Sequence, residues 1–182
     1  MSNTFLTADT HFGHKNILTF KGEDGNPIRD FNSVEEMDEH LVDCWNKVVK
    51  PKDTVYHLGD VCINRRALKT VERLNGRKIL IKGNHDVFRA NEYLEYFEDI
   101  RAYKIFAKHR IICSHIPIHP ESLNRWDANF HGHLHANNIP FYSESGEKYY
   151  CVSVEQNNYE PISLDKMLEI KGIIQGGSKY EN

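Results

Sequence analysis

Aspartate, asparagine and histidine side chains recur in this sequence just after short apolar runs. The eleven histidines are dispersed along the chain, so they do not form a tag. Five segments carry the residues concerned: Asp9 and His11; Asp60; Asn84 and His85; His115; and His133 and His135. Ligands of α/β proteins bind at the carboxyl ends of strands, so we expect these side chains to share one sheet edge. Asp and His without cysteine suit Mn, Fe, Zn, Co or Ni.

The spacing of these residues favours a pair of ions. Asp9 and His11 are separated by one residue, and so are His133 and His135. In an extended segment residues two apart lie on the same side, so each pair is expected to face one ion. The carboxylate of Asp60 is suited to a place between two ions. Two ions about 3.5–4 Å apart are suited to clamp the attacking and leaving oxygens at phosphorus.

Three glycines precede these residues directly or by one position, namely Gly59, Gly83 and Gly132. Glycine permits sharp turns and a close approach of backbone to a ligand. Each glycine alone is weak support, because glycine ends strands in many proteins.

The first half of the chain predicts alternating strands and helices. Strands are expected at residues 5–8, 54–58 and 78–81. Ser33 and Glu36 have the capping-box spacing at the start of a helix, and its apolar face is Val34, Met37, Leu41, Trp45 and Val48. Further helices are expected from Asn64 to residue 74 and at residues 91–97. This alternation predicts a largely parallel sheet covered by helices.

The second half is richer in strands. Residues 101–107 and 110–113 predict a hairpin, and further strands are expected before Gly132 and at residues 149–154. Ser163 is expected to cap a last helix through residue 170. Residues 21–32 predict a loop, and residues 176–182 a disordered tail. The whole pattern predicts an α/β sandwich with mixed sheets, in one domain spanning residues 1–175.

Composition places further bounds on function. The 182 residues include 23 Lys and Arg against 26 Asp and Glu, a formal net charge of −3, so nucleic acid is not a favoured partner. There is no apolar run long enough to cross a membrane and no basic segment typical of a signal peptide, which predicts a cytoplasmic protein. The four cysteines are dispersed and expected to be small buried hydrophobes. The oligomeric state stays open.

Five motifs follow one another between residues 9 and 135: Asp9-Thr10-His11, Gly59-Asp60, Gly83-Asn84-His85-Asp86, Ser114-His115 and Gly132-His133-Leu134-His135. In order and form they resemble those of the calcineurin-like metallophosphoesterases, and no block is missing. The small size and residues 9–17 are similar to a compact bacterial or phage-type branch. The resemblance therefore implies a type of reaction for this chain but does not name its substrate.

The resemblance implies a four-layer α/β sandwich, with two mixed β-sheets flanked by helices, and a dinuclear metal centre. Manganese is the first expectation for both ions, with iron, zinc, cobalt or nickel as alternatives. The implied ligands are Asp9, His11 and His135 for the first ion, Asp60 as the bridge, and Asn84, His115 and His133 for the second.

The resemblance also assigns His85 as the catalytic histidine. In the implied reaction, hydroxide between the metals attacks phosphorus, while His85 stabilises the phosphate charge or protonates the leaving oxygen. Asp86 either orients His85 or caps the following turn. The expected substrate is a small phosphoester, with phosphodiesters or nucleotide-type molecules ahead of protein phosphates.

Several residues near the motifs keep two interpretations. His14 either reaches substrate phosphate or caps a helix. Lys15, Asn16 and Arg29 are either a phosphate clamp or ordinary solvated charges. Trp126 either stacks on a nucleobase beside the metals or packs in a core.

Other histidines are expected to act less directly or not at all. His57 and His131 are expected to pack behind the site, and His119 is a candidate to line it. His40 and His109 are expected to have no role.

Two other functions remain as alternatives. A nuclease or RNA-processing enzyme would use the same metals, with a basic patch of Arg65, Arg66, Arg77 and Lys78. A binding or scaffold protein on an inactive fold would be expected to lack ligands or His85, and here all of them are present. A metal-dependent phosphoric ester hydrolase is therefore the leading prediction.

Overall fold

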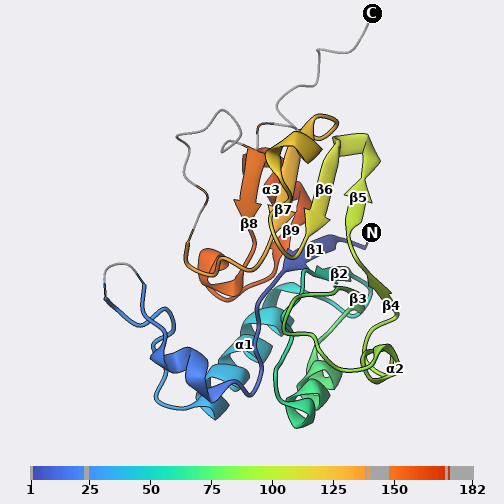
Figure 1. Ribbon diagram of the computed structural model, residues 1–182. Helices are drawn as coiled ribbons and strands as arrows, with labels where there is room; N and C mark the ends of the chain where they lie inside the picture. Colours follow the sequence, from blue (N-terminus) through green and yellow to red (C-terminus); the bar gives the residue numbers. More distant parts are fainter. Residues whose placement is uncertain (1, 23–24, 138, 140–147, 171, 173–182) are drawn as a thin grey trace, which may run out of the picture.

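The computed structural model describes residues 2–22, 25–137, 139, 148–170 and 172, which form two packed β-sheets with helices around them (Figure 1). The first sheet has the order β4-β3-β2-β1-β9, with β1 Thr4–Thr7, β2 Thr54–His57, β3 Arg77–Ile81, β4 Asp99–Arg101 and β9 Ile162–Ser163. The second has the order β5-β6-β7-β8, with β5 Lys104–Phe106, β6 Ile111–Ser114, β7 Ala128–His131 and β8 Tyr149–Cys151.

Both sheets are mixed, as the sequence predicts. In the first, β1 to β4 are parallel and β9 is antiparallel to β1. In the second, β6, β7 and β8 are parallel and β5 is antiparallel to β6. The parallel strands of each sheet therefore end at one common edge. The predicted α/β fold class is confirmed.

Helix α1 (Val34–Val48) begins and runs as its pattern predicts. The Ser33 side chain accepts a hydrogen bond from the backbone N–H of Glu36 at 3.1 Å. The Glu36 carboxylate reaches the backbone N–H of Asn32, one residue before the position that a capping box requires. Met37 and Trp45 lie on the buried face, which packs the helix against the first sheet.

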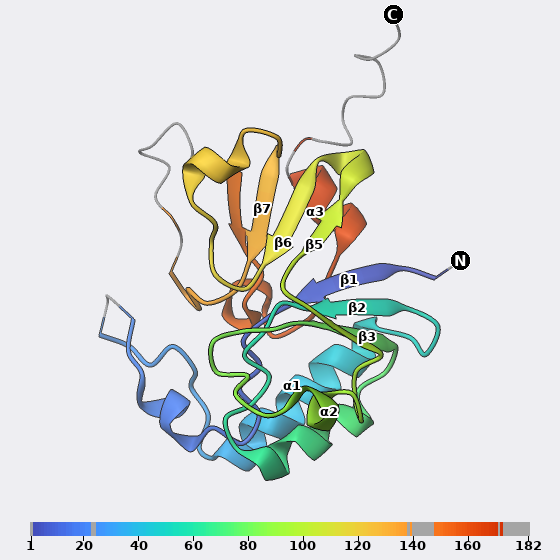
Figure 2. The same cartoon turned by 45° about the vertical axis from the view of Figure 1, so that its right-hand side comes forward.

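Figure 2 shows the layers of the fold, and two apolar cores lie between them. One core lies between the first sheet and α1, α2 (Ala90–Tyr93) and the 3-10 helix η2 (Arg65–Arg73). The other lies between the two sheets and includes α3 (Leu164–Ile170). The outer face of the second sheet is covered by a loop, where Ile118 bonds to Asn129 and Tyr149. This loop carries the 3-10 helix η4 (Pro120–Leu123).

Some predicted elements differ in the structure. Asn64 caps η2 as expected, but the segment is a 3-10 helix because its buried residues Leu68, Val71 and Leu74 recur every three positions. The predicted strand 101–107 is divided, since Arg101 ends β4 in the first sheet and Lys104 begins β5 in the second.

Two further elements are shorter than predicted. The helix expected at 91–97 extends only over Ala90–Tyr93, and the strand expected at 149–154 is β8, which ends at Cys151, before the 3-10 helix η6 (Val154–Asn157). Ser163 caps α3 as expected, through the backbone N–H of Lys166. The predicted tail 176–182 lies outside the described residues.

The carboxyl edges of the two sheets are joined directly. Ala8, just after β1, forms a parallel bridge with Ser153, just after β8. The backbone N–H of Val154 donates to the carbonyl of Ala8 at 3.1 Å. The loops that follow strands of both sheets therefore meet in one place.

Candidate metal centre

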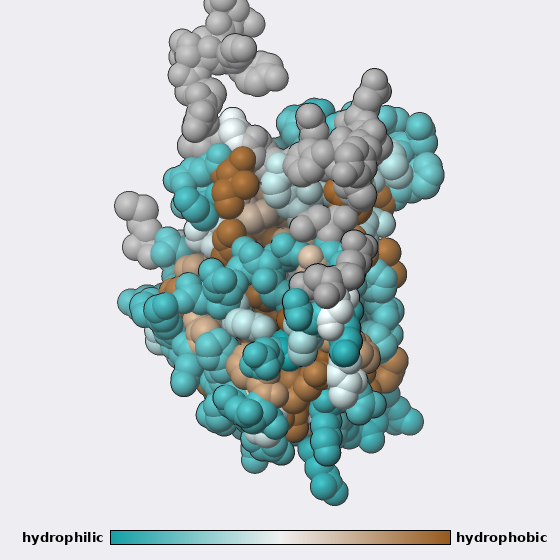
Figure 3. All heavy atoms as spheres, turned by 90° about the vertical axis from the view of Figure 1, so that its left-hand side faces the viewer, coloured by the Kyte–Doolittle hydropathy of each residue, from teal (hydrophilic) through white to brown (hydrophobic). Residues whose placement is uncertain are grey.

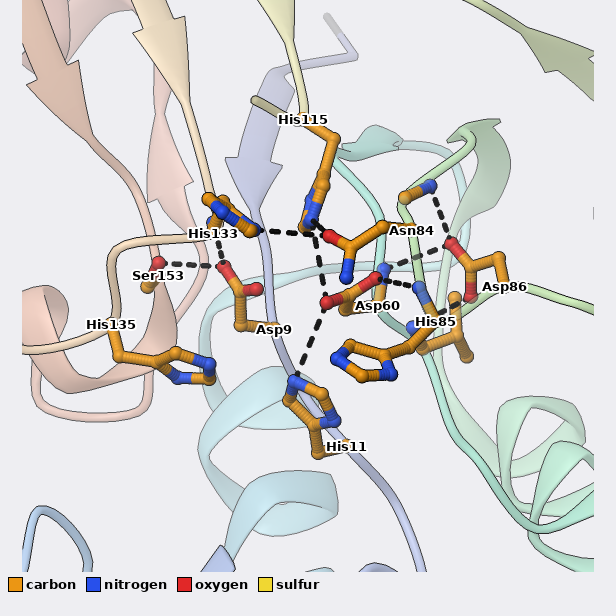
Figure 4. A network of polar contacts seen from close by, with 12 residues as sticks. Asp9, His11, Asp60, Asn84, His85, Asp86, His115, His133, His135 and Ser153 are labelled. Carbon is orange, nitrogen blue, oxygen red and sulfur yellow. Dashed lines mark hydrogen bonds and ion pairs between the residues drawn. The ribbon is translucent and has the colours of Figure 1, made fainter. Parts of the chain in front are cut away.

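All seven predicted ligands and His85 converge at this meeting place (Figure 4). The loops after β1, β2 and β3 contribute Asp9, His11, Asp60, Asn84 and His85, and the loops after β6 and β7 contribute His115, His133 and His135. Their side chains point toward one another across a small central space. The shared edge that the sequence predicts is therefore present.

The ligand atoms fall into two groups, each compact enough to hold one ion. Within each group, one ligand atom from every residue lies within 4.8 Å of the others; the groups are Asp9, His11 and His135, and Asp60, His115 and His133. Oδ2 of Asp60 lies 3.6 Å from Nε2 of His11 and 3.3 Å from Nε2 of His115. Asp60 therefore lies between the two groups.

The expectation that His133 and His135 face a single ion is wrong. The two belong to different groups, because the backbone between them is not extended. The backbone from Asp9 to His11 is not extended either. Five of the eight non-glycine residues with positive φ in the described chain are proposed ligands: Asp9 (59°), His11 (49°), Asp60 (59°), His133 (70°) and His135 (53°). Such conformations cost about 1–3 kcal/mol each and gather at functional sites.

Backbone hydrogen bonds hold the first two of these conformations in place. The N–H of Asp9 donates to the carbonyl of Gly59 at 2.9 Å, and the N–H of His11 donates to the carbonyl of Asp60 at 3.1 Å. The loops after β1 and β2 therefore continue the pairing of their strands. The left-handed turns direct successive side chains to the same space.

Two glycines permit the close approach that the sequence predicts. A Cβ at Gly83 would collide with the Asp60 side chain, and one at Gly132 would lie 2.6 Å from Oδ2 of Asp9. Any larger residue at either position would displace a carboxylate. The glycines are therefore required by the packing of the site.

The second group brings ring nitrogens and an amide oxygen that are suited to bind a metal close together. Nδ1 of His115 lies 2.7 Å from the carbonyl of Leu58, which only accepts, so Nδ1 carries a hydrogen and Nε2 is the ring nitrogen that faces the other ligands. This Nε2 lies 2.8 Å from Oδ1 of Asn84, which in turn lies 3.0 Å from Nδ1 of His133. Ring nitrogens and an amide oxygen that converge in this way are ligand types that fit a first-row metal cation.

The first group has buried polar atoms without hydrogen bonds. Among the described residues, Oδ1 of Asp9 and both ring nitrogens of His11 have no hydrogen-bond partner. Burial raises the pKa of Asp9 to about 6 and lowers the pKa of His11 to about 2. A divalent cation would stabilise the carboxylate as an anion and use the neutral imidazole as a ligand, so these residues fit a metal ion.

Asp60 is held as an anion by its surroundings. Burial opposes its charge, but the hydrogen bond and the charge of His115, with the backbone N–H of His85, hold the pKa of Asp60 at about 2. That N–H donates to Oδ1 of Asp60 at 2.8 Å, which leaves Oδ2 directed at the two groups. The same contact places the exposed His85 ring at the open side, 5.6 Å from the His11 ring between centroids.

Asp86 fastens the loops instead of orienting the His85 ring. Its carboxylate accepts hydrogen bonds from the backbone N–H groups of Asp60, Val61 and Gly83, at 2.8, 2.9 and 2.8 Å. All three donors precede Asp86 in the chain, so the carboxylate neither orients the His85 ring nor caps the turn that follows it, and both interpretations are wrong. Three donors around one buried carboxylate hold the loops after β2 and β3 together.

Two buried residues at the site were missed by sequence reasoning. Oγ of Ser153 donates to Oδ2 of Asp9 at 2.6 Å, and Oε1 of Glu155 lies 2.9 Å from Nδ1 of His135. Glu155 could have been found by the same signal as the ligands, since it follows the predicted strand at 149–154, whereas Ser153 lies inside that range and follows a strand only because β8 ends at Cys151.

Arg29 is neither a solvated charge nor a clamp open to substrate. Its side chain is fully buried and lies 2.8 Å from Glu155. It also donates to the backbone carbonyls of Asp9 and Thr10. Arg29 therefore lies behind the ligand loop after β1.

His14 lies beside the first group. It occupies the N-cap position of the 3-10 helix η1 (Lys15–Thr19), but its side chain makes no capping hydrogen bond. Its ring centroid lies 5.4 Å from that of His11 and 6.0 Å from that of Phe20, and its buried Nδ1 has no hydrogen-bond partner among the residues described. The capping interpretation is therefore wrong.

The prediction that Trp126 borders the metals is wrong. Trp126 precedes the amino end of β7, whereas the ligands follow its carboxyl end. His119 is exposed and caps η4 by accepting a hydrogen bond from the backbone N–H of Glu121. Lys15 and Asn16 are exposed and line a separate cavity with the first residues of α1.

His57 and His131 pack behind the site, as expected. Nε2 of His57 lies 3.0 Å from Oγ of Thr10, and Nδ1 of His131 lies 2.8 Å from the carbonyl of Gly132. Burial lowers the pKa of His57 to about 3 and that of His131 to about 4. Both rings are therefore neutral supports at neutral pH.

The basic patch expected for nucleic acid is largely paired with acids. Arg65 lies 2.5 Å from Glu92, and Arg77 lies 2.7 Å from Glu98. The Lys78 ammonium donates to two backbone carbonyls.

Of the cysteines, Cys62 and Cys113 are buried, while Cys44 and Cys151 are only partly buried. Within the described residues, every helix is too short or too polar to cross a membrane.

Comparisons with known proteins agree with this geometry. The chain is 36% identical over 181 residues to an uncharacterized protein of Methanocaldococcus jannaschii, MJ1445, covering 93% of this chain and 92% of that one. It is 40% identical over 91 residues to the gene 66 protein of Mycobacterium phage L5, covering 47% of this chain and 41% of that protein. The phage protein fits the predicted phage-type branch.

A solved structure shares the fold along nearly the whole chain. The protein of unknown function AQ665 from Aquifex aeolicus superposes with a TM-score of 0.68 at 28% identity, covering 93% of this chain and all of that one. The sequence model of the calcineurin-like phosphoesterases matches residues 3–166. The chain therefore belongs to the calcineurin-like phosphoesterase family.

Proposed function

We propose that this protein hydrolyses phosphodiesters or nucleotide-type phosphate esters with two divalent metal ions. The observation that carries the proposal is the pair of adjacent ligand groups with Asp60 between them and an exposed His85 at their open side. The proposed ligands are Asp9, His11 and His135 for the first ion, Asp60 for both, and Asn84, His115 and His133 for the second.

The donor set suits manganese, iron, zinc, cobalt or nickel, and manganese is our first choice. Ions bound there would supply Lewis-acid activation of a water nucleophile and neutralise charge at phosphorus. The chain's own residues would do the rest. His85 would donate a hydrogen bond to a phosphate oxygen or a proton to the departing alkoxide.

A cavity beside the second group supports the preference for diesters. Its volume is about 330 Å³, and it is lined by Lys82, Asn84, His115 and the exposed Ile116 among others. Such a space has room for the second substituent of a diester, and Lys82 would favour an anionic substrate. His14 would contact the substrate on the opposite, first-group side.

The surface around the site fits a polar substrate. Figure 3 views the molecule from the side toward which β1 runs, and hydrophilic residues predominate on this face, with smaller hydrophobic areas among them. The nuclease alternative has less support, because Arg65 and Arg77 are engaged in ion pairs. The inactive-scaffold alternative has less still, since His85 and every proposed ligand are present.

The test is hydrolysis of bis-(p-nitrophenyl) phosphate and of p-nitrophenyl phosphate with added Mn²⁺, with bound metal measured on the same samples. We expect diester turnover that falls at least about 10²-fold in His85→Ala while two ions remain bound. His119→Ala, which changes an exposed histidine away from the site, is the matched control.

Two outcomes would contradict the proposal. Absence of bound metal after Mn²⁺ loading would remove its basis. Two bound ions with equal turnover in wild type and His85→Ala would remove the role of His85.

A further inference from the structure

A buried ion pair lies behind the first ligand group. Nη2 of Arg29 and Oε1 of Glu155 are 2.8 Å apart, and the exposed fractions of the two side chains are 0% and 4%. Nε of Arg29 donates to the same oxygen at 2.8 Å. Burying two charges is costly, so a pair in this position calls for an explanation beyond packing.

The glutamate end of this pair determines the hydrogen position on a proposed metal ligand. Oε1 of Glu155 also lies 2.9 Å from Nδ1 of His135. A carboxylate only accepts hydrogen bonds, so Nδ1 of His135 carries the hydrogen and Nε2 keeps its lone pair. His135 is thereby prepared to bind an ion through Nε2.

The arginine end fastens the loop that carries the other two ligands of this group. Nη1 of Arg29 donates to the carbonyl of Thr10 at 2.9 Å, and Nη2 donates to the carbonyl of Asp9. These carbonyls belong to the strained segment from Asp9 to His11. One guanidinium therefore connects all three ligands of the first group without facing the central space.

We infer that Glu155 and Arg29 are positioning residues that set the affinity of the first ion. Glu155 holds His135 in the Nδ1–H tautomer, and Arg29 holds both Glu155 and the Asp9–His11 backbone. The inference rests on the proposed function in one respect, that Asp9, His11 and His135 bind an ion. Partners of this kind typically contribute 10- to 100-fold to metal affinity.

The direct test is the affinity for Mn²⁺ at each of the two sites, measured by competition with a fluorescent chelator. We expect E155Q to weaken Mn²⁺ binding at one site, the one that includes His135, by about 10- to 100-fold and to leave the other unchanged. E160Q is the matched control, since Glu160 pairs with Lys47 at the surface. It removes the same charge from the same segment and is expected to bind both ions normally.

Loss of folding is separated from loss of positioning by two further measurements. E155Q leaves the Arg29 cation buried without its partner, so the double variant R29M/E155Q is expected to regain thermal stability but not metal affinity. Long-range ¹H–¹⁵N NMR reads the His135 tautomer in metal-free protein, at a pH where the ring is neutral. Wild type is expected to show Nδ1–H alone, and E155Q a loss of that restriction, because its amide offers a donor as well as an acceptor.

The outcomes distinguish this inference from the function on which it rests. Wild-type protein that binds no Mn²⁺ would overturn the proposed function and the inference together. Two ions bound equally tightly by wild type and folded E155Q would overturn the inference alone. An unchanged His135 tautomer in E155Q would do the same.

Discussion

The two ligand groups are supported by different kinds of partner. In the first, His135 is aligned by the Glu155 carboxylate and Asp9 by the Ser153 hydroxyl, which are side chains. In the second, His115 is aligned by the backbone carbonyl of Leu58. Side-chain support is lost with one substitution, whereas a backbone carbonyl is present whatever the residue. The first group should therefore be sensitive to mutations behind it, and the second mainly to mutations of its own ligands.

Asp60→Asn is expected to affect both groups and not one alone, because this carboxylate lies between them. We expect weaker binding of both ions and a loss of diester turnover of at least about 10³-fold, since several kcal/mol of charge stabilisation depend on the pair. Metal content and turnover are the measurements, with the exposed Asp127→Asn as control. Selective loss of a single ion would show that Asp60 belongs to one group only.

Asn84→Ala tests the second group separately from the first. Asn84 Oδ1 lies between His115 and His133, so we expect the second ion to bind about tenfold or more weakly while the first is unaffected. Titration with Mn²⁺ measures both affinities. An equal loss at both sites would contradict the assignment of Asn84 to the second group.

The buried His57 ring, which packs behind the first group, makes the stability of the folded protein depend on pH. Its ring bonds to Thr10, between Asp9 and His11, and burial lowers its pKa from 6.5 to about 3. The unfolded chain takes up this proton below about pH 6.5, while the folded protein does not. Stability from this group is therefore complete above pH 6.5 and is lost as the pH falls toward 3, by up to about 1.4 kcal/mol per pH unit.

The measurement is urea unfolding of metal-free protein between pH 4 and pH 8, for wild type and His57→Gln. We expect the wild type to lose stability more steeply than the variant as the pH falls. Parallel curves would show that the His57 ring is not a buried neutral support.

Ser153→Ala should have the smallest effect. Oδ2 of Asp9 would lose the hydroxyl donor but keep the backbone N–H of His133 at 2.9 Å. Loss of one such bond costs about 1 kcal/mol, so the first ion should bind roughly three- to tenfold more weakly. The exposed Ser122→Ala is the control. A change in the second ion alone would contradict the division between the groups.

Much of the site could be predicted from the sequence, because its residues follow strands. Asp9, Asp60 and Asn84 each follow a strand that is recognisable as a short apolar run, and parallel strands end at one edge. The left-handed turns at Asp9 and His135 could not be predicted in this way. Backbone conformation in a loop depends on contacts with other loops, such as the hydrogen bond from Asp9 to Gly59.

The local sequence by itself determined the first three strands, β1, β2 and β3, the α1 cap at Ser33 and the order of the motifs, since these depend on neighbouring residues. Only the tertiary structure decided that Arg29 is buried behind the site, that Trp126 lies at the far end of its strand, and that His133 and His135 face different groups. These outcomes depend on how the two sheets pack. Packing brings Arg29 against Glu155, which is 126 residues away in the sequence. A pattern of neighbouring residues does not predict a contact between residues so far apart.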